Sequence, residues 1–231
     1  MVGMGTAVAL DPGRPVLEQL RDRVAALEGG PSRLAVPTLP ALDGVLSLRT
    51  GGSYGVDSAS LALALAAGAS RAGEWVGFAG WPDLGVEAAA AMGVELSRTV
   101  VVPEPGEHWL EVVAALVDVL RVVVLRPPSG VDARAAGVVD ARLRSRSSVL
   151  VVWGEWPRCE ARLSLEQPRW SGLGGADDLS AGHGRLRSRE GRLAVRRGTT
   201  PTVRTDVRWW DDDEALTTLA PAATPRWAAQ A

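Results

Sequence analysis

Several common residue types are missing from this chain of 231 residues. It has no Lys, no Asn and no Ile, and all 25 of its basic residues are Arg. A chain without lysine cannot use any mechanism that requires a lysine side chain, because arginine keeps its charge and differs in shape. Composition therefore excludes lysine-dependent chemistry.

Cysteine, histidine and long apolar runs are also scarce. Cys159 is the single cysteine, and His108 and His183 are the two histidines, so we expect neither an internal disulfide nor a Cys/His metal site. The longest apolar runs, such as residues 61–67, are far shorter than the roughly 20 residues of a membrane-spanning helix. We expect a cytoplasmic protein with no membrane partner.

The residues that are present indicate one globular domain with an uneven charge. Hydrophobic residues make up 46% of the chain and the net charge is −2. Residues 1–120 carry 7 Arg against 14 acidic residues, whereas residues 121–231 carry 18 Arg against 13. The densest arginine segment indicates a solvated face, with a nucleic-acid contact and an acidic protein partner as the functional alternatives. The candidate contacts are Arg185, Arg187, Arg189, Arg192, Arg196 and Arg197.

Strand and helix patterns alternate along the middle of the chain, which is typical of a parallel sheet flanked by helices. Strands are expected at 45–48, 75–79, 99–102, 122–125 and 148–153, and helices at 58–67, 85–92, 108–120 and 131–143. A glycine-rich turn is expected at 50–55. From residue 160 onward, stretches of alternating polarity predict antiparallel strands that complete the sheet.

The two ends of the chain differ from this core. Residues 15–28 predict an amphipathic leading helix, which has its apolar residues at helical spacing and is a candidate for docking on a partner. Its apolar side chains are Leu17, Leu20, Val24 and Leu27. We therefore divide the chain into a helix at 1–30, a core at 31–210 and an acidic, then Ala/Pro-rich, flexible tail at 211–231.

The order of these elements, with Gly44–Gly51 before the first core helix and an apolar strand at 122–125, resembles the RecA core. In that family a Gly-x-x-x-x-Gly-Lys-Thr turn wraps the phosphates of a nucleotide. In the frame that begins at Gly51, this chain has Val56 in place of the second glycine, Asp57 in place of the lysine, and Ser58. The magnesium-holding aspartate after the 122–125 strand is replaced by Arg126. The resemblance therefore implies a degenerate phosphate-binding turn, no cofactor and no catalysis.

Among RecA-like proteins without a working turn, the chain resembles the ImuA-type accessory proteins of the bacterial damage-inducible mutasome. The residues that carry this resemblance are the degenerate turn, the segment 162–174 and the strand around His183. The resemblance implies a noncatalytic subunit of the SOS response and translesion synthesis, associated with the nucleoid during DNA damage. Its partner would be an ImuB-like inactive Y-family polymerase, with an error-prone replicative polymerase reached indirectly, and with RecA or DNA as further partners. The alternatives are a regulator of RecA filaments or of cell division, and a free-standing DNA-binding domain.

Two further features point to function. Trp209 and Trp210 are adjacent, and neighbouring strand residues face opposite ways, so one ring is expected in the core and the other at a partner interface. The stretch from Gly51 to Gly55 also matches Gly-x-Ser-x-Gly, the nucleophile elbow of serine hydrolases, with Ser53 as the nucleophile. No oxyanion-loop motif precedes this stretch, so the hydrolase is a minor alternative.

Overall fold

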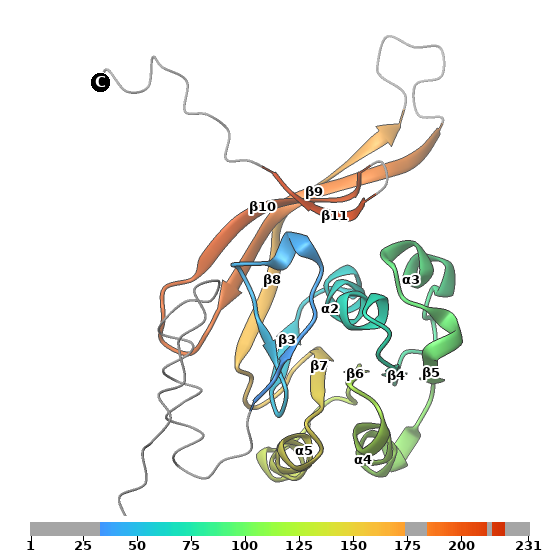
Figure 1. Ribbon diagram of the computed structural model, residues 1–231, viewed down its shortest axis with the longest axis vertical. Helices are drawn as coiled ribbons and strands as arrows, with labels where there is room; N and C mark the ends of the chain where they lie inside the picture. The colour runs from blue at the N-terminus through green and yellow to red at the C-terminus, as the bar shows by residue number, and fades with distance from the viewer. Residues whose placement is uncertain (1–32, 174–183, 212–213, 220–231) are drawn as a thin grey trace, which may run out of the picture. The chain divides into compact units, whose positions relative to one another are not determined.

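A computed structural model describes residues 33–173, 184–211 and 214–219 of the chain. The strands of its main sheet are β3 (Ser53–Val56), β4 (Val76–Ala79), β5 (Thr99–Val102), β6 (Val122–Leu125), β7 (Val149–Trp153), β8 (Ala161–Leu173), β9 (Gly184–Arg196), β10 (Val203–Asp211) and β11 (Glu214–Thr218). They lie in the order β11-β10-β9-β8-β3-β7-β6-β4-β5 (Figure 1). A separate two-stranded sheet pairs β1 (Ala35–Val36) with β2 (Leu48–Arg49).

The main sheet has a parallel half and an antiparallel half. Neighbouring strands from β8 to β5 in this order run parallel, whereas β8, β9, β10 and β11 pair antiparallel. The protein is therefore α/β, with a mostly parallel sheet that ends in antiparallel C-terminal strands, as the sequence predicts. The strands β3, β4 and β6 are buried at every position, and apart from Tyr54 their residues are small or apolar.

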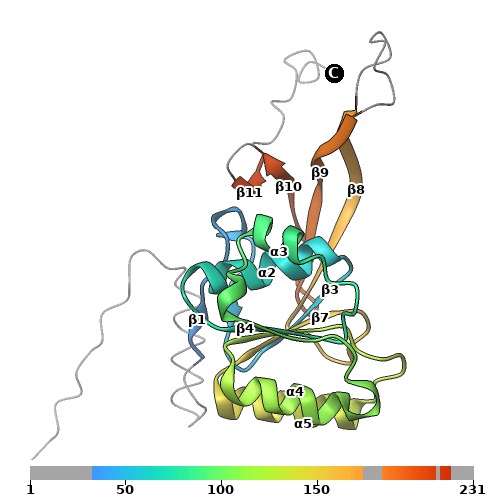
Figure 2. The ribbon, with the colours of Figure 1, turned by 90° about the vertical axis from the view of Figure 1, so that its right-hand side faces the viewer.

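Helices cover both faces of the parallel half (Figure 2). Helices α2 (Ala59–Arg71) and α3 (Val86–Met92) lie on one face, and α4 (Trp109–Val119) and α5 (Ala133–Arg146) lie on the other. Short 3-10 turns η1 (Pro40–Leu42), η2 (Leu96–Arg98) and η3 (Gly106–His108) join these elements. Helix α2 is buried from Ser60 to Ser70, because it packs in one core with β3 and with β8 to β11, whereas α4 and α5 share a second core.

Two sequence predictions near the start of the core are wrong. The expected strand at 45–48 is instead the short strand β2, and the expected turn at 50–55 contains strand β3. Strand β3 is hard to predict because glycine and serine are more typical of turns than of strands. Strand β3 lies between β7 and β8, where small residues fit because both of its edges are paired.

The sheet continues past residue 210, where the sequence predicts that the core ends. Strand β10 continues to Asp211, and β11 adds a further edge strand to the sheet. Ala215 and Leu216 of β11 are buried in the core, so this segment gains apolar burial that a flexible tail would not have. The four apolar residues of the leading helix lie outside the described residues. Among the described residues, no helix is long and apolar enough to cross a membrane.

Candidate functional site

The carboxyl edge of the parallel strands contains a topological switch point of the sheet. The chain leaves β3 toward β4 on one side and leaves β7 toward β8 on the other, although β3 and β7 are neighbours. Open α/β sheets bind ligands at such a switch point, outside the carboxyl ends of their strands. The residues that stand at this edge therefore decide what the sheet can bind.

At this edge β3 and α2 are joined by only Asp57 and Ser58. The carboxylate of Asp57 accepts hydrogen bonds from the backbone N–H of Leu165, at 3.1 and 3.3 Å, so it is tied to strand β8. The side chain of Ser58 does not cap α2, and its hydroxyl lies 3.4 Å from that of Ser60. A loop that wraps phosphates needs a run of backbone N–H groups between strand and helix. Two residues cannot supply that run.

The four residues of the predicted turn therefore do not share one loop. Gly51 precedes β3, where its positive φ of 79° turns the chain and its N–H donates to the carbonyl of Ser148 at 2.7 Å. Val56 is the last residue of β3 and is fully buried. Because the whole of β3 stands between Gly51 and Asp57, the phosphate-binding frame inferred from the sequence has no structural counterpart.

The rest of the edge is closed by an aromatic group, which we call the edge cluster: Trp81, Trp153 and Arg126. The two indole rings are 4.7 Å apart at their centroids, and Trp81 also meets Phe78 edge to face at 6.0 Å. The guanidinium of Arg126 lies 4.6 Å from the centroid of Trp153, and its Nη1 is 3.2 Å from Oδ1 of Asp83. Arg126 directly follows β6, as the sequence predicts, and here it covers an indole ring.

A glycine allows this edge to close. Gly80 has a φ of 73°, and a methyl group at this position would collide with the carbonyl oxygen of Arg126. The N–H of Arg126 in turn donates to the carbonyl of Ala79 at 2.9 Å. The ends of β4 and β6 can therefore approach each other only because this residue has no side chain.

A second aromatic group lies across the antiparallel half, and we call it the strand cluster: Trp170, Arg189, Trp209 and Trp210. Trp170, Arg189 and Trp209 lie opposite one another on β8, β9 and β10. The guanidinium carbon of Arg189 is 5.2 Å from the ring centroid of Trp170 and 5.8 Å from that of Trp209. Its Nη1 donates to Ser60 at the start of α2, at 3.1 Å. Arginine is thus held between two indole rings and the first turn of a helix.

The strand cluster is exposed on its outer side. Trp209 is completely buried, as predicted for one member of the pair, whereas Trp170 is 49% exposed and stacks on Trp210 at 5.9 Å with an angle of 17° between the rings. Trp210 has a φ of 58°, which is costly for a bulky residue. Burial lowers the pKa of Arg189, against the opposing charge of Asp57. Sequence reasoning missed Trp170, because only the pairing of strands brings it beside Arg189.

The arginines predicted to contact nucleic acid differ in their exposure and in the groups that they bind. Arg192 pairs with Asp206 at 2.9 Å, and Arg197 donates to the carbonyl of Val45 at 2.6 Å. Arg196 is exposed on β9. Arg185 and Arg187 lie in β9, but their side chains are outside the described residues. The structure therefore does not gather the described members into one basic face.

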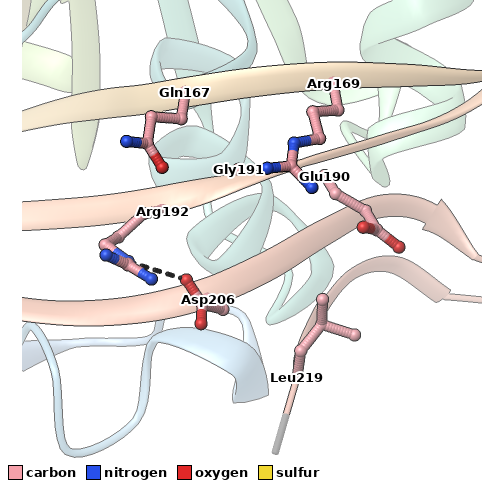
Figure 3. A pocket seen from close by; sticks show the side chains of 7 residues that line it. All are labelled: Gln167, Arg169, Glu190, Gly191, Arg192, Asp206 and Leu219. Carbon is pink, nitrogen blue, oxygen red and sulfur yellow. Dashed lines mark hydrogen bonds and ion pairs between the residues drawn. The ribbon is translucent and has the colours of Figure 1, made fainter. Parts of the chain in front are cut away.

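Several arginines on the polar face of the antiparallel half are instead neutralised by cross-strand ion pairs. Arg204 reaches both carboxylate oxygens of Glu166, at 3.1 and 3.2 Å, and Arg208 reaches Glu190 at 2.6 Å. A hollow of about 290 Å³ lies on this half of the sheet (Figure 3). Its lining residues are Gln167, Arg169, Glu190, Gly191, Arg192, Asp206 and Leu219. Both signs of charge line it, so the hollow has no preference for an anion.

The remaining polar groups give no hydrolytic site. Ser53 is the buried first residue of β3 and donates to the carbonyl of Arg158 at 2.9 Å, whereas a nucleophile elbow requires an exposed turn after the strand. Nearby, burial raises the pKa of Asp140 on α5, against the opposing effects of Ser53, Trp156 and others. Among the described residues, no His, Cys, Asp and Glu group could hold a metal ion.

Comparison with known proteins gives two findings. The sequence profile of a family described as the MT3502 N-terminal domain matches residues 40–158, which run from η1 to the segment before β8. The uncharacterized protein Rv3395c of Mycobacterium tuberculosis is 39% identical over 163 residues, which cover 67% of this chain and 78% of that protein.

Proposed function

The chain belongs to the MT3502 N-terminal domain family, and we propose that it is a noncatalytic RecA-type subunit of a damage-inducible translesion-synthesis complex. Its task in this proposal is to bind an ImuB-like inactive polymerase homologue in the cytoplasm. The main support for a noncatalytic role is that only two residues connect β3 and α2. A subunit that cannot wrap phosphates there must act by binding another molecule.

The closed carboxyl edge supports the same conclusion. Where a RecA-type enzyme needs an acidic residue for magnesium, Arg126 lies over Trp153 and pairs with Asp83. Magnesium prefers carboxylates and other oxygen ligands, so a guanidinium at this point opposes the binding of the metal. The edge is therefore suited to stability of the fold and unsuited to nucleotide hydrolysis.

The strand cluster is the surface that we assign to the partner. Tryptophan and arginine are enriched in the energetic centres of protein interfaces, and Trp170 and Trp210 stack with one ring half exposed. Four acidic residues, Asp211 to Glu214, follow Trp210 directly in the sequence. Acidic residues next to Trp210 in the sequence disfavour a nucleic acid and favour a protein segment that carries basic and apolar side chains.

Affinity purification of the tagged full chain from cells after DNA damage tests this proposal. We expect the wild type to recover an ImuB-like protein, and Trp170→Ala and Trp210→Ala to lose at least tenfold of that recovery. Trp75→Ala is the matched control, because Trp75 is 48% exposed but lies before β4, in the parallel half. Recovery of RecA alone, or of salt-labile DNA without a protein, would contradict the proposal.

A further inference from the structure

The register of β8 and β9 places two arginines directly opposite each other. Arg162 on β8 is paired with Arg196 on β9. Side chains of directly opposed residues share a face of the sheet, with their Cβ atoms about 4.5–5.5 Å apart, and like charges in this position are destabilising. The pairing of two cations therefore needs a physical reason.

Other arginines on this face form ion pairs with acidic residues on neighbouring strands. Arg192, Arg204 and Arg208 each have an acidic partner across the strands, at distances between 2.6 and 3.1 Å. Within the described part of the chain, neither Arg162 nor Arg196 has an ion pair with a carboxylate. The sheet thus leaves one uncompensated pair of cations at the end that adjoins β3.

These two arginines line a hollow of about 480 Å³ that opens to the surface. Its lining residues are Glu155, Trp156, Pro157, Cys159, Arg162, Arg196 and Gly198. Glu155 is the single acidic residue among them and is itself exposed, so solvent screens its charge. Unlike the hollow of Figure 3, this one is lined by more cations than anions.

The guanidinium of Arg162 is held in place beside the strand. Its Nη1 donates to the carbonyl of Gly154 at 3.2 Å. A Cβ at Gly55 would stand 3.1 Å from its Cζ and 3.2 Å from the sulfur of Cys159, so the missing side chain of Gly55 makes room for the guanidinium. A guanidinium has five N–H donors, and one hydrogen bond to a carbonyl leaves the others for a ligand.

We propose that this hollow binds a phosphate group between Arg162 and Arg196. Two guanidinium groups are the donors best suited to phosphate oxygens, and the bound anion removes the repulsion between them. The phosphate belongs either to a free nucleotide or to the backbone of a single-stranded nucleic acid, since both present the same oxygens. The site does not depend on a polymerase partner, because it lies at β3, away from the rings of Trp170 and Trp210 on β8 and β10.

The test uses the full chain and three probes: inorganic phosphate, deoxycytidine monophosphate and a fluorescent single-stranded oligonucleotide. Binding is measured by calorimetry for the small probes and by anisotropy at two salt concentrations for the oligonucleotide. The informative variant is Arg196→Glu, which replaces an exposed side chain and places a carboxylate opposite Arg162, as in the neighbouring pairs. Arg204→Gln, on the same face but already paired with Glu166, is the matched control.

We expect Arg196→Glu to weaken every probe that binds the wild type by at least about tenfold, because a charged hydrogen bond is lost and repulsion is added. Its melting temperature without phosphate should stay level or rise, which separates loss of the site from loss of the fold. Arg204→Gln should change binding by less than about twofold. Oligonucleotide binding far tighter than mononucleotide binding assigns the site to a nucleic-acid backbone, and equal affinities assign it to a free nucleotide. Failure of all three probes to bind the wild type, or binding that Arg196→Glu leaves unchanged, overturns the proposal.

Discussion

Each half of the sheet contains tryptophan rings packed against an arginine, but the two groups are arranged in opposite ways. In the edge cluster of the parallel half, Trp81 is buried and Arg126 lies outside, over a ring. In the strand cluster of the antiparallel half, Arg189 lies inside and Trp170 is half exposed. The first arrangement closes a surface with a hydrated charge, whereas the second leaves an aromatic ring available for a partner.

The difference follows from what each half packs against. Helices cover both faces of the parallel half (Figure 2), so Trp81 of the edge cluster is buried in the core and the charge of Arg126 is left at the rim. Strands β8 to β10 carry alternating polarity, and one face stays open to solvent. A ring at the end of such a strand is buried only if something else covers it.

The largest expected effect on the free energy of unfolding comes from removing one tryptophan ring from each cluster in turn. Trp81→Ala should lower the free energy of unfolding by about 3–5 kcal/mol, because it deletes a buried aromatic side chain. Trp170→Ala should lower it by about 1 kcal/mol, the value of an exposed stacking contact. Urea unfolding followed by circular dichroism measures both values. Equal losses would show that the two clusters are not inverted.

The closure of the edge cluster depends on Gly80. Gly80→Ala should destabilise the protein by about 2 kcal/mol, since alanine is strained at a positive φ and its methyl group collides with the carbonyl of Arg126. Gly137→Ala is the control, because Gly137 lies in α5 with open space around it and alanine favours a helix by about 0.5–1 kcal/mol. The midpoint of urea unfolding should therefore fall in the first variant and rise in the second. A Gly80→Ala protein as stable as the wild type would mean that the edge can open without cost.

Salt should change the stability cost of replacing Arg126 but not that of replacing Arg189. Arg126→Gln should cost about 0.5–1 kcal/mol at low salt and less in 1 M sodium chloride, because its ion pair with Asp83 and its contact with Trp153 are exposed. The cost of Arg189→Gln should not change with salt, because that guanidinium is partly desolvated and burial lowers its pKa. Unfolding free energies at both salt concentrations make the comparison. A salt-sensitive Arg189 would place it at the surface.

Strands that are apolar throughout could be predicted from the sequence, whereas β3, a strand with small residues in the same parallel half, could not. Uniformly apolar runs such as Val122–Leu125 and Val149–Trp153 can be stable only in a strand covered on both faces, so pattern alone locates them. Strand β3 was missed because its small residues are typical of a turn, and its strand conformation comes from pairing with β7 and β8. Local sequence does not show which distant strands will pair with β3.

The residues of the candidate site could likewise be predicted only where local sequence determines their position. Arg126 and the pair Trp209 and Trp210 could be identified from their positions beside strands. The pairs Arg162–Arg196 and Trp170–Arg189 could not be identified. The register of β8 and β9 shifts between Ser171 and Leu173, and again between Glu166 and Arg169. A one-residue shift reverses which face each side chain occupies. Cross-strand neighbours beyond a bulge therefore require a structure.

The smallest expected effect concerns Asp140, a carboxyl group that the parallel half keeps partly inside. Burial raises its pKa above 3.8, so the folded protein binds its proton more tightly than the unfolded chain does. The charged form then costs stability once the pH is above this raised pKa, and the cost disappears as the pH falls below 3.8. Asp140→Asn removes the charge, so its gain over the wild type should appear as the pH rises from 3 to 7 and stay below about 1 kcal/mol, because the group is only half buried. Urea unfolding at several pH values measures this difference. A gain that is constant with pH would show that Asp140 is as well solvated in the fold as in the unfolded chain, and the parallel half would then tolerate a carboxylate inside it as readily as the antiparallel half tolerates Arg189.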